Sequence, residues 1–169
     1  WSTGSYLECQ DFWRLSGIER DVFLYSQPKI AVKDFRVVST LDDSYTNGIF
    51  KLAVDIRNNA ATDKNLQVLY ELIDKASGKV VANATESCIV KGEDIQTVTF
   101  GANLPRVKTW TSEGPNLYKM LISLKEEDKV TEIVPFNVGF RRIEIKQIGQ
   151  IAKNGKPYVV LMINGQPLK

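Results

Sequence analysis

The 169-residue sequence predicts an all-β fold, and three observations support this prediction. Apolar and polar residues alternate in several short segments, with the period of two that a half-buried strand requires. Short turns rich in Gly, Asn, Asp and Ser separate these segments, and no stretch shows a competing helical period. Seven or so strands at a spacing of about 10 to 16 residues, spanning about 110 residues, indicate an immunoglobulin-like antiparallel β-sandwich.

The strands can be followed in order along the chain. A strand is expected over 30–37, where a change of phase near Asp34 predicts a β-bulge. After the turn-rich stretch 42–48, the alternation over 50–57 marks the clearest half-buried strand. Five further β segments are expected, the first two forming a hairpin through Ser77-Gly78: 66–72, 80–82, 95–100, 117–124 and 130–138.

A new element begins after Phe140. Residues 142–146 alternate in polarity, Asn154-Gly155 predicts a hairpin turn, and 158–163 is a continuous apolar run. The sandwich is therefore expected to have β segments from neighbouring domains on its flanks.

Composition excludes several classes of partner. Hydrophobic residues make up 43% and charged residues 25% of the chain, which is ordinary for a globular protein. The net charge is +2 and no run of Lys or Arg exceeds two residues, so neither nucleic acid nor an anionic membrane is expected as a partner. No apolar stretch approaches the roughly 20 residues that a helix needs to cross a bilayer. The sequence opens on Trp1 without an initiator Met, and we expect the natural start to lie elsewhere.

The available side chains limit the chemistry. Without any histidine, this chain lacks the base or ligand of Ser-His-Asp, Cys-His and His-metal sites. Cys9 and Cys88 show no zinc-ligand spacing and are predicted to be free thiols. Any catalysis would therefore have to use carboxylates.

Carboxylates and aromatic rings gather in the first 25 residues. Such a mixture is found in sugar sites, where rings stack on pyranose faces and carboxylates accept hydrogen bonds from hydroxyl groups. The same mixture is typical of a domain interface. Composition alone favours the interface over a sugar site. The charged members are Glu8, Asp11, Arg14, Glu19, Arg20 and Asp21.

Three other features are interpreted as structural. Asn83-Ala84-Thr85 matches a glycosylation acceptor but falls within an expected strand, whose edge we expect to face solvent. The acidic pairs at 42–43 and 126–128 lack the ligand spacing of a calcium loop and are expected to be solvated turns. Trp110, before a Pro-containing turn, is interpreted as a packing anchor in preference to a ligand platform.

Four motifs carry a resemblance to a known family. Residues 4–22, GSYLECQDFWRLSGIERDV, resemble the motif that closes the sugar-binding domain of family 2 β-galactosidases. Residues 110–118, WTSEGPNLY, are similar to a late-strand element of that family, and 138–141, VGFR, to its link between sandwich and catalytic barrel. Residues 164–169, NGQPLK, resemble the motif that begins the barrel. All four occur in the family's order.

The resemblance implies three regions. Residues 1–27 would be the C-terminal end of a jelly-roll sugar-binding domain, and 28–139 the immunoglobulin-like sandwich. Residues 140–169 would be a linker and the truncated start of a catalytic TIM barrel. The implied partners are other domains of the same polypeptide, and the compartment, bacterial cytoplasm or periplasm, stays unknown.

The resemblance also implies a role for one residue. The acid of the family's Q-D-x-W segment reaches the galactosyl subsite and helps to hold a monovalent cation, and this role falls on Asp11. Retaining hydrolysis of β-galactosides requires two carboxyl groups, which the family places on the barrel, so no catalytic residue is expected in this chain. Sodium and magnesium are expected for the parent enzyme only. Two departures are Cys9, where relatives often have an acid, and extra sequence between Lys146 and Ile163.

Three functional hypotheses remain. The leading one is a non-catalytic spacer between the sugar-binding domain and the barrel. The second is an independent carbohydrate-binding or adhesive module, which the sandwich architecture favours and the linker motifs at both ends oppose. The third is an intrinsic enzyme, which would need a carboxylate pair such as Asp11 with Glu113.

Overall fold

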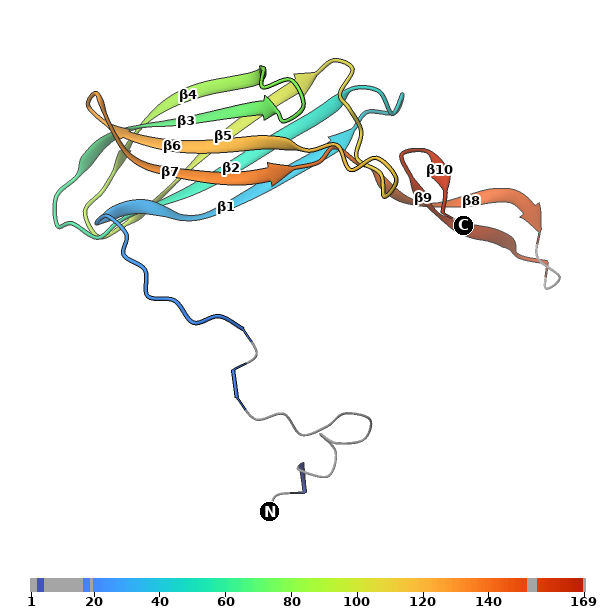
Figure 1. Cartoon of the computed structure of the whole chain (residues 1–169), viewed down its shortest axis with the longest axis horizontal. Helices are drawn as coiled ribbons and strands as arrows, with labels where there is room; N and C mark the ends of the chain where they lie inside the picture. Colours follow the sequence, from blue (N-terminus) through green and yellow to red (C-terminus); the bar gives the residue numbers. More distant parts are fainter. Residues whose placement is uncertain (1–2, 5–16, 19, 152–154, 169) are drawn as a thin grey trace.

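The computed structural model describes residues 3–4, 17–18, 20–151 and 155–168. All named elements in these ranges are strands (Figure 1). They are β1 (Ile30–Leu41), β2 (Gly48–Asn58), β3 (Lys64–Asp74), β4 (Val80–Val90), β5 (Ile95–Leu104), β6 (Tyr118–Glu126), β7 (Lys129–Val138), β8 (Ile143–Ile151), β9 (Pro157–Ile163) and β10 (Gln166–Pro167).

The first seven strands form a two-layer sandwich. One sheet has the order β1-β2-β5 and the other β4-β3-β6-β7, and every pairing within them is antiparallel. A third sheet, β10-β9-β8, projects as a long hairpin from one end of the sandwich (Figure 1). The antiparallel immunoglobulin-like sandwich predicted from the sequence is confirmed.

The hydrophobic core lies between the two sheets. It is formed by the inward-facing side chains of strands in which buried and exposed residues alternate. In β2 every second residue, from Phe50 to Ile56, is almost completely buried, while the intervening side chains are partly or fully exposed. Three aromatic rings join the sheets: Tyr70 of β3 lies 5.2 Å from Phe50 and 5.1 Å from Phe100, measured between ring centroids. Aromatic pairs at such distances add about 0.5–1.5 kcal/mol beyond the burial of their surface.

Two sequence details have clear outcomes. The expected bulge near Asp34 is present, because the register of β1 on β2 shifts between Val32 and Asp34. The strand expected over 80–82 extends much further, to Val90. Because β4 is an edge strand with most residues exposed or half-buried, it lacks the alternation by which strands are recognised.

The chain before β1 leaves the sandwich. Residues 20–29 run away from the end at which β1 begins (Figure 1). Apolar side chains there lie open to solvent, with Phe23 77% and Leu24 103% exposed. The proposed domain boundaries at 27/28 and 139/140 stay predictions.

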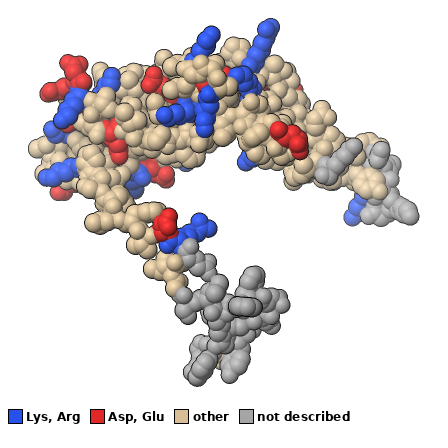
Figure 2. Space-filling model, in the orientation of Figure 1, with Lys and Arg blue, Asp and Glu red and all other residues tan. Residues whose placement is uncertain are grey.

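Both signs of charge occur on the face of the sandwich that Figure 2 shows. Lys and Arg lie there together with Asp and Glu. In the part of the chain that the structure describes, no helix is long and apolar enough to cross a membrane.

Candidate functional site at the junction of sandwich and hairpin

The sandwich is tied to the hairpin where β7 ends. Phe140 is fully buried, and its ring meets Tyr118 edge-on with 5.3 Å between centroids. The backbone N–H of Trp110 donates to the carbonyl oxygen of Phe140 at 2.8 Å. At Gly139 an added Cβ would lie 3.1 Å from the Cβ of Trp110, so this position favours a residue without a side chain. The VGFR segment is therefore packed into the sandwich and does not act as a free linker.

Trp110 anchors a folded loop. It forms an antiparallel bridge with Pro115, and the Thr111 hydroxyl accepts a hydrogen bond from the N–H of Gly114 at 2.9 Å. The guanidinium group of Arg141 lies 4.7 Å from the centre of the Trp110 ring, a cation–π contact. The interpretation of Trp110 as a packing anchor agrees with these contacts.

Asn164 connects that loop to the hairpin. Its amide nitrogen donates to the carbonyl oxygen of Trp110 at 2.9 Å, and its amide oxygen accepts from the N–H of Arg142 at 2.9 Å. Asn164 adopts a left-handed backbone with φ of 50°, which Asn tolerates better than most residues. The NG motif thus fixes the turn between β9 and β10 against the sandwich.

The loop between β1 and β2 is folded around Asp42. Its carboxylate accepts hydrogen bonds from the hydroxyl of Ser44 and from the backbone and side chain of Asn47. These bonds, with that from Ser44 the strongest, lower the pKa of Asp42 to about 2. The solvated turn expected here is in fact highly organised, and it holds Tyr45 at a positive φ of 56°. An aromatic residue in this conformation is strained, and such strain is commonly retained where it positions a side chain.

Tyr45 lies at the centre of a polar cluster between the β1–β2 loop and the start of the hairpin. Its hydroxyl donates to Glu144 Oε2 at 2.7 Å and accepts from Lys146 Nζ at 2.6 Å. Arg142 forms ion pairs with Glu144 at 2.9 Å and with Asp43 at 2.6 Å. We call these five residues, Asp43, Tyr45, Arg142, Glu144 and Lys146, the Tyr45 latch. It joins positions about 100 residues apart in the sequence.

The charges of the latch suit a structural contact between sandwich and hairpin better than acid–base catalysis. The hydrogen bond from Tyr45, assisted by Lys146 and Arg142, lowers the pKa of the Glu144 carboxyl group. Glu144 is therefore ionised at neutral pH and is a poor proton donor. Its charge is balanced by two cations of the cluster, Arg142 and Lys146. What the arrangement can do is fix the direction in which the hairpin leaves the sandwich.

The residues considered for a sugar site or a domain interface lie largely outside the described residues. Asp11, to which substrate and cation binding were assigned, lies outside the described residues, as do Glu8, Arg14 and Glu19. Arg20 and Asp21 are described and exposed. Glu113 is exposed on the Trp110 loop, and its suggested pairing with Asp11 is not tested.

The other candidate residues behave as structural or surface groups. Asn83 and Thr85 are exposed on the edge strand β4, as expected. Glu126 pairs with Lys64 at 2.7 Å and so is more than a solvated turn residue. Among the described residues, no group of three or more His, Cys, Asp or Glu side chains could hold a metal ion. Cys9 is not described, and burial raises the pKa of the Cys88 thiol.

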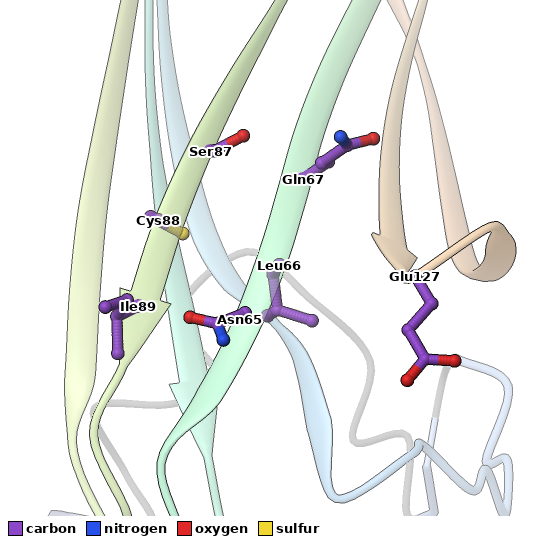
Figure 3. Close-up of a pocket in the computed structure, with 7 residues that line it drawn as sticks. All are labelled: Asn65, Leu66, Gln67, Ser87, Cys88, Ile89 and Glu127. Atoms are coloured by element: carbon purple, nitrogen blue, oxygen red, sulfur yellow. The ribbon is translucent and has the colours of Figure 1, made fainter.

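One surface groove lies far from the junction in the fold, on β3 and β4. It is an open hollow of about 410 Å³, and Figure 3 shows the side chains that surround it. The lining residues are Asn65, Leu66, Gln67, Ser87, Cys88, Ile89 and Glu127. These side chains include no aromatic ring on which a sugar could stack, so the groove gives the binding-module hypothesis little support.

Comparison with known proteins decides the family. The model of glycosyl hydrolases family 2 matches residues 30–141, which include the whole sandwich and the VGFR segment. The chain belongs to this family. A β-galactosidase of Priestia megaterium is 37% identical over 165 residues, and one of Halalkalibacterium halodurans is 39% identical over 164 residues. These alignments cover 97% and 96% of the family 2 chain.

The same relatives are much longer than this chain, which spans 16% and 15% of their lengths. Among solved structures, an exo-chitosanase of Amycolatopsis orientalis superposes with a TM-score of 0.70 at 20% identity. That match covers 90% of this chain and 17% of the other. At this identity the likeness shows the fold alone, and the fold is the immunoglobulin-like region of family 2 enzymes.

The latch does not follow from the sequence pattern. Tyr45 belongs to a turn-rich stretch, and the alternation over 142–146 indicates only a strand. Two signals were present: one aromatic residue within a polar turn, and charged side chains at three alternate positions at the start of the hairpin, Arg142, Glu144 and Lys146. Only the fold shows that they meet.

Proposed function

We propose that this chain is the non-catalytic immunoglobulin-like spacer of a β-galactosidase-like family 2 glycosidase. Its task is to set the geometry between a preceding sugar-binding domain and a following catalytic domain. The parent enzyme would hydrolyse terminal β-galactosides with retention, using two glutamates outside this chain.

The Tyr45 latch is the observation that carries this proposal. Three features hold the hairpin where it leaves the sandwich. They are the buried Phe140, the hydrogen bond from the Asn164 side chain to the backbone of Trp110, and the five-residue polar cluster. A flexible linker would need none of these. Because the contacts lie on both the β1–β2 loop and the Trp110 loop, they restrict bending of the hairpin in more than one direction.

The β-galactosidase relatives support the rest of the proposal. Their similarity extends over nearly all of this chain while the chain spans less than a sixth of their length, as an internal segment would. Asp11 would contribute from this segment to the galactosyl subsite and to a sodium ion there. Its partners would be the other domains of the same polypeptide.

A chromogenic β-galactoside assay tests the proposal. The chain and its full-length parent are assayed side by side with sodium and magnesium present. Turnover by the parent alone supports a spacer, whereas turnover by the 169-residue chain would overturn it. Calorimetric titration of the chain with galactosides adds a second result: measurable binding without turnover would favour an independent carbohydrate-binding module.

A further inference from the structure

The chain enters the sandwich through a short buried stretch. Ile30, Ala31 and Val32, the first residues of β1, are 9%, 2% and 7% exposed, whereas the segment 20–29 before them lies in solvent. Consecutive strand residues point to opposite faces, so three buried residues in a row mean that both faces of this stretch are covered. The β-bulge follows directly, because the register on β2 shifts between Val32 and Asp34.

The sequence pattern fixes the register of this entering stretch. If the register found after the bulge continued to the start of β1, Lys33 would lie opposite Ile56, which is completely buried. The ammonium group of Lys33 would then face the core without a partner, which is strongly unfavourable. The pattern does not determine how firmly the outer edge of β1 is held.

The outer edge of β1 meets the edge of another strand. β1 and β7 are edge strands of different sheets, and they lie side by side (Figure 1). The rings of Phe35 and Phe136 meet edge-on, with 5.2 Å between centroids. Further along, the Ser39 hydroxyl donates to the carbonyl oxygen of Gly139 at 2.9 Å. Because an edge strand has backbone groups that its own sheet leaves unpaired, β7 is placed to satisfy such groups on β1.

Glu132 of β7 satisfies one of these groups at the point of entry. Its Oε2 accepts a hydrogen bond from the backbone N–H of Val32 at 2.7 Å, across 100 residues of sequence. Glu132 lies opposite the fully buried Leu124, so its half-buried side chain starts from the core-facing side of β7. A hydrogen bond from an N–H to a carboxylate is stronger than one between neutral groups. Loss of the acceptor would leave the N–H of Val32 without this partner in a buried stretch, which is costly.

The inner edge of the entering strand is bonded to β2. Ile30 lies opposite Asn58, and the N–H of Asn59 donates to the carbonyl oxygen of Lys29 at 2.8 Å. A strand that is bonded along one edge alone can twist about that edge. The bond from Glu132 on the opposite edge removes this freedom just where the chain turns out into solvent.

We propose that Glu132 is a positioning residue, which fixes the direction in which the segment 20–29 enters the sandwich. It acts at the start of the sandwich as the Tyr45 latch acts at its end, through a contact between residues about 100 positions apart. The inference rests on the proposed function in one respect, namely that the region before this segment helps to bind the substrate. Glu132 then influences substrate binding through the entering strand and not by contact with the substrate.

Amide exchange of Val32, followed by NMR in the 169-residue chain, tests the hydrogen bond. In Glu132→Ala this amide should exchange at least about tenfold faster than in the unaltered chain. Glu132→Gln keeps an acceptor oxygen at the same reach and should give an intermediate rate. Glu86→Ala is the matched control and should leave the rate unchanged, because Glu86 is exposed on β4, the other edge strand of the same sheet. If Glu132→Ala does not fold, Glu132→Asp supplies the comparison, with a carboxylate on a shorter side chain.

The full-length parent tests the positioning. KM for a chromogenic β-galactoside should rise about threefold or more in Glu132→Ala while kcat changes by less than about twofold, because the catalytic glutamates lie outside this chain. Glu132→Gln should recover most of the KM, and Glu86→Ala should leave both constants unchanged. Amides of residues 20–29 should also exchange faster in Glu132→Ala, because a misdirected segment packs less well against the region before it.

Three results would overturn the inference. Unchanged exchange of Val32 in Glu132→Ala would show that the bond does not hold the strand. Exchange in Glu132→Gln as fast as in Glu132→Ala would show that an acceptor oxygen at this position has no effect. Faster exchange of Val32 with unchanged exchange of residues 20–29 would confine the effect to the sandwich. The exchange measurements do not depend on hydrolysis, so they decide the role of Glu132 even if the parent lacks β-galactosidase activity and the proposed function fails.

Discussion

The hydroxyl of Tyr45 lies 2.7 Å from Glu144 Oε2, across 99 residues of sequence, and thereby joins the first turn of the sandwich to the first strand of the hairpin. Arg142 and Lys146 lie 5.5 and 5.3 Å from the centre of the same ring. The ring thus has cations over it and a carboxylate at its hydroxyl. These contacts give the junction of sandwich and hairpin a defined geometry instead of a flexible connection.

Gly165→Ala tests the packing of Tyr45 against the hairpin. An added Cβ would lie 2.7 Å from the Tyr45 ring, at a φ of +78°. Gly155→Ala is the matched control, because its φ is +76° and nothing lies within 4 Å. Both substitutions should cost about 1 kcal/mol from backbone strain, and Gly165→Ala a further 1–3 kcal/mol from overpacking.

Exchange of the β8 amides and thermal unfolding measure this difference. The Gly165 variant should release the base of the hairpin, while the sandwich retains its own melting transition. Equal effects of the two substitutions would show that Tyr45 does not restrain the hairpin.

Gly48→Ala tests the packing of Phe140 at the same junction. The new Cβ would lie 2.8 Å from the Phe140 ring and 2.8 Å from Val107, both of which would have to shift. We expect a loss of about 1–3 kcal/mol in the free energy of unfolding, measured by urea titration. Gly101→Ala, in β5, would place its Cβ 3.9 Å from the carbonyl oxygen of Phe50 and should be neutral or stabilising. Similar losses for both variants would contradict the close packing.

The sequence predicted the fold far better than the site, for a physical reason. Strand β2 could be recognised because burial on one face imposes alternation on a local stretch, and the bulge near Asp34 because it interrupts that pattern. Strand β4 was underestimated because an edge strand carries little of this constraint. The latch depends on contacts between residues about 100 positions apart, and no local pattern encodes which strand Tyr45 will meet.

Removal of residues 1–25 should leave the sandwich folded. Val22, Phe23 and Leu24 are 76%, 77% and 103% exposed, so their loss removes little buried surface. The apolar core lies between Ile30 and Phe140. By calorimetry, the truncated chain should unfold in one cooperative transition, with a melting temperature within about 2 °C of that of the 169-residue chain. A broad, non-cooperative transition would show that the proposed boundary at 27/28 cuts into the domain.

Asp11→Asn tests the role inferred for the N-terminal segment in the full-length enzyme. The substitution removes one negative charge while keeping the side-chain shape, so kcat/KM should fall and its dependence on sodium should weaken. Circular dichroism should be unchanged. Asp21→Asn, at an exposed position in the same segment, is the control. Unchanged kinetics across a series of sodium concentrations would show that Asp11 is not part of a sugar site.

Acid should destabilise the sandwich over a defined pH range. A hydrogen bond from Lys108 at 2.7 Å, with others from Ala76 and Ser77, lowers the pKa of Asp74 to about 2. The unfolded chain, with an ordinary pKa of 3.8, binds more protons than the folded chain between these values. The stabilisation is therefore complete above pH 4 or so and is lost as the pH falls from about 4 to about 2.

Asp74→Asn should flatten the dependence of the melting temperature on pH in that range, while stability at neutral pH falls because the ion pair with Lys108 is lost. Some slope should remain, since Asp42 also has a pKa of about 2. Asp128→Asn, at an exposed turn, is the charge-matched control. If both variants melt with the same pH profile, the ion pair of Asp74 contributes nothing to acid stability.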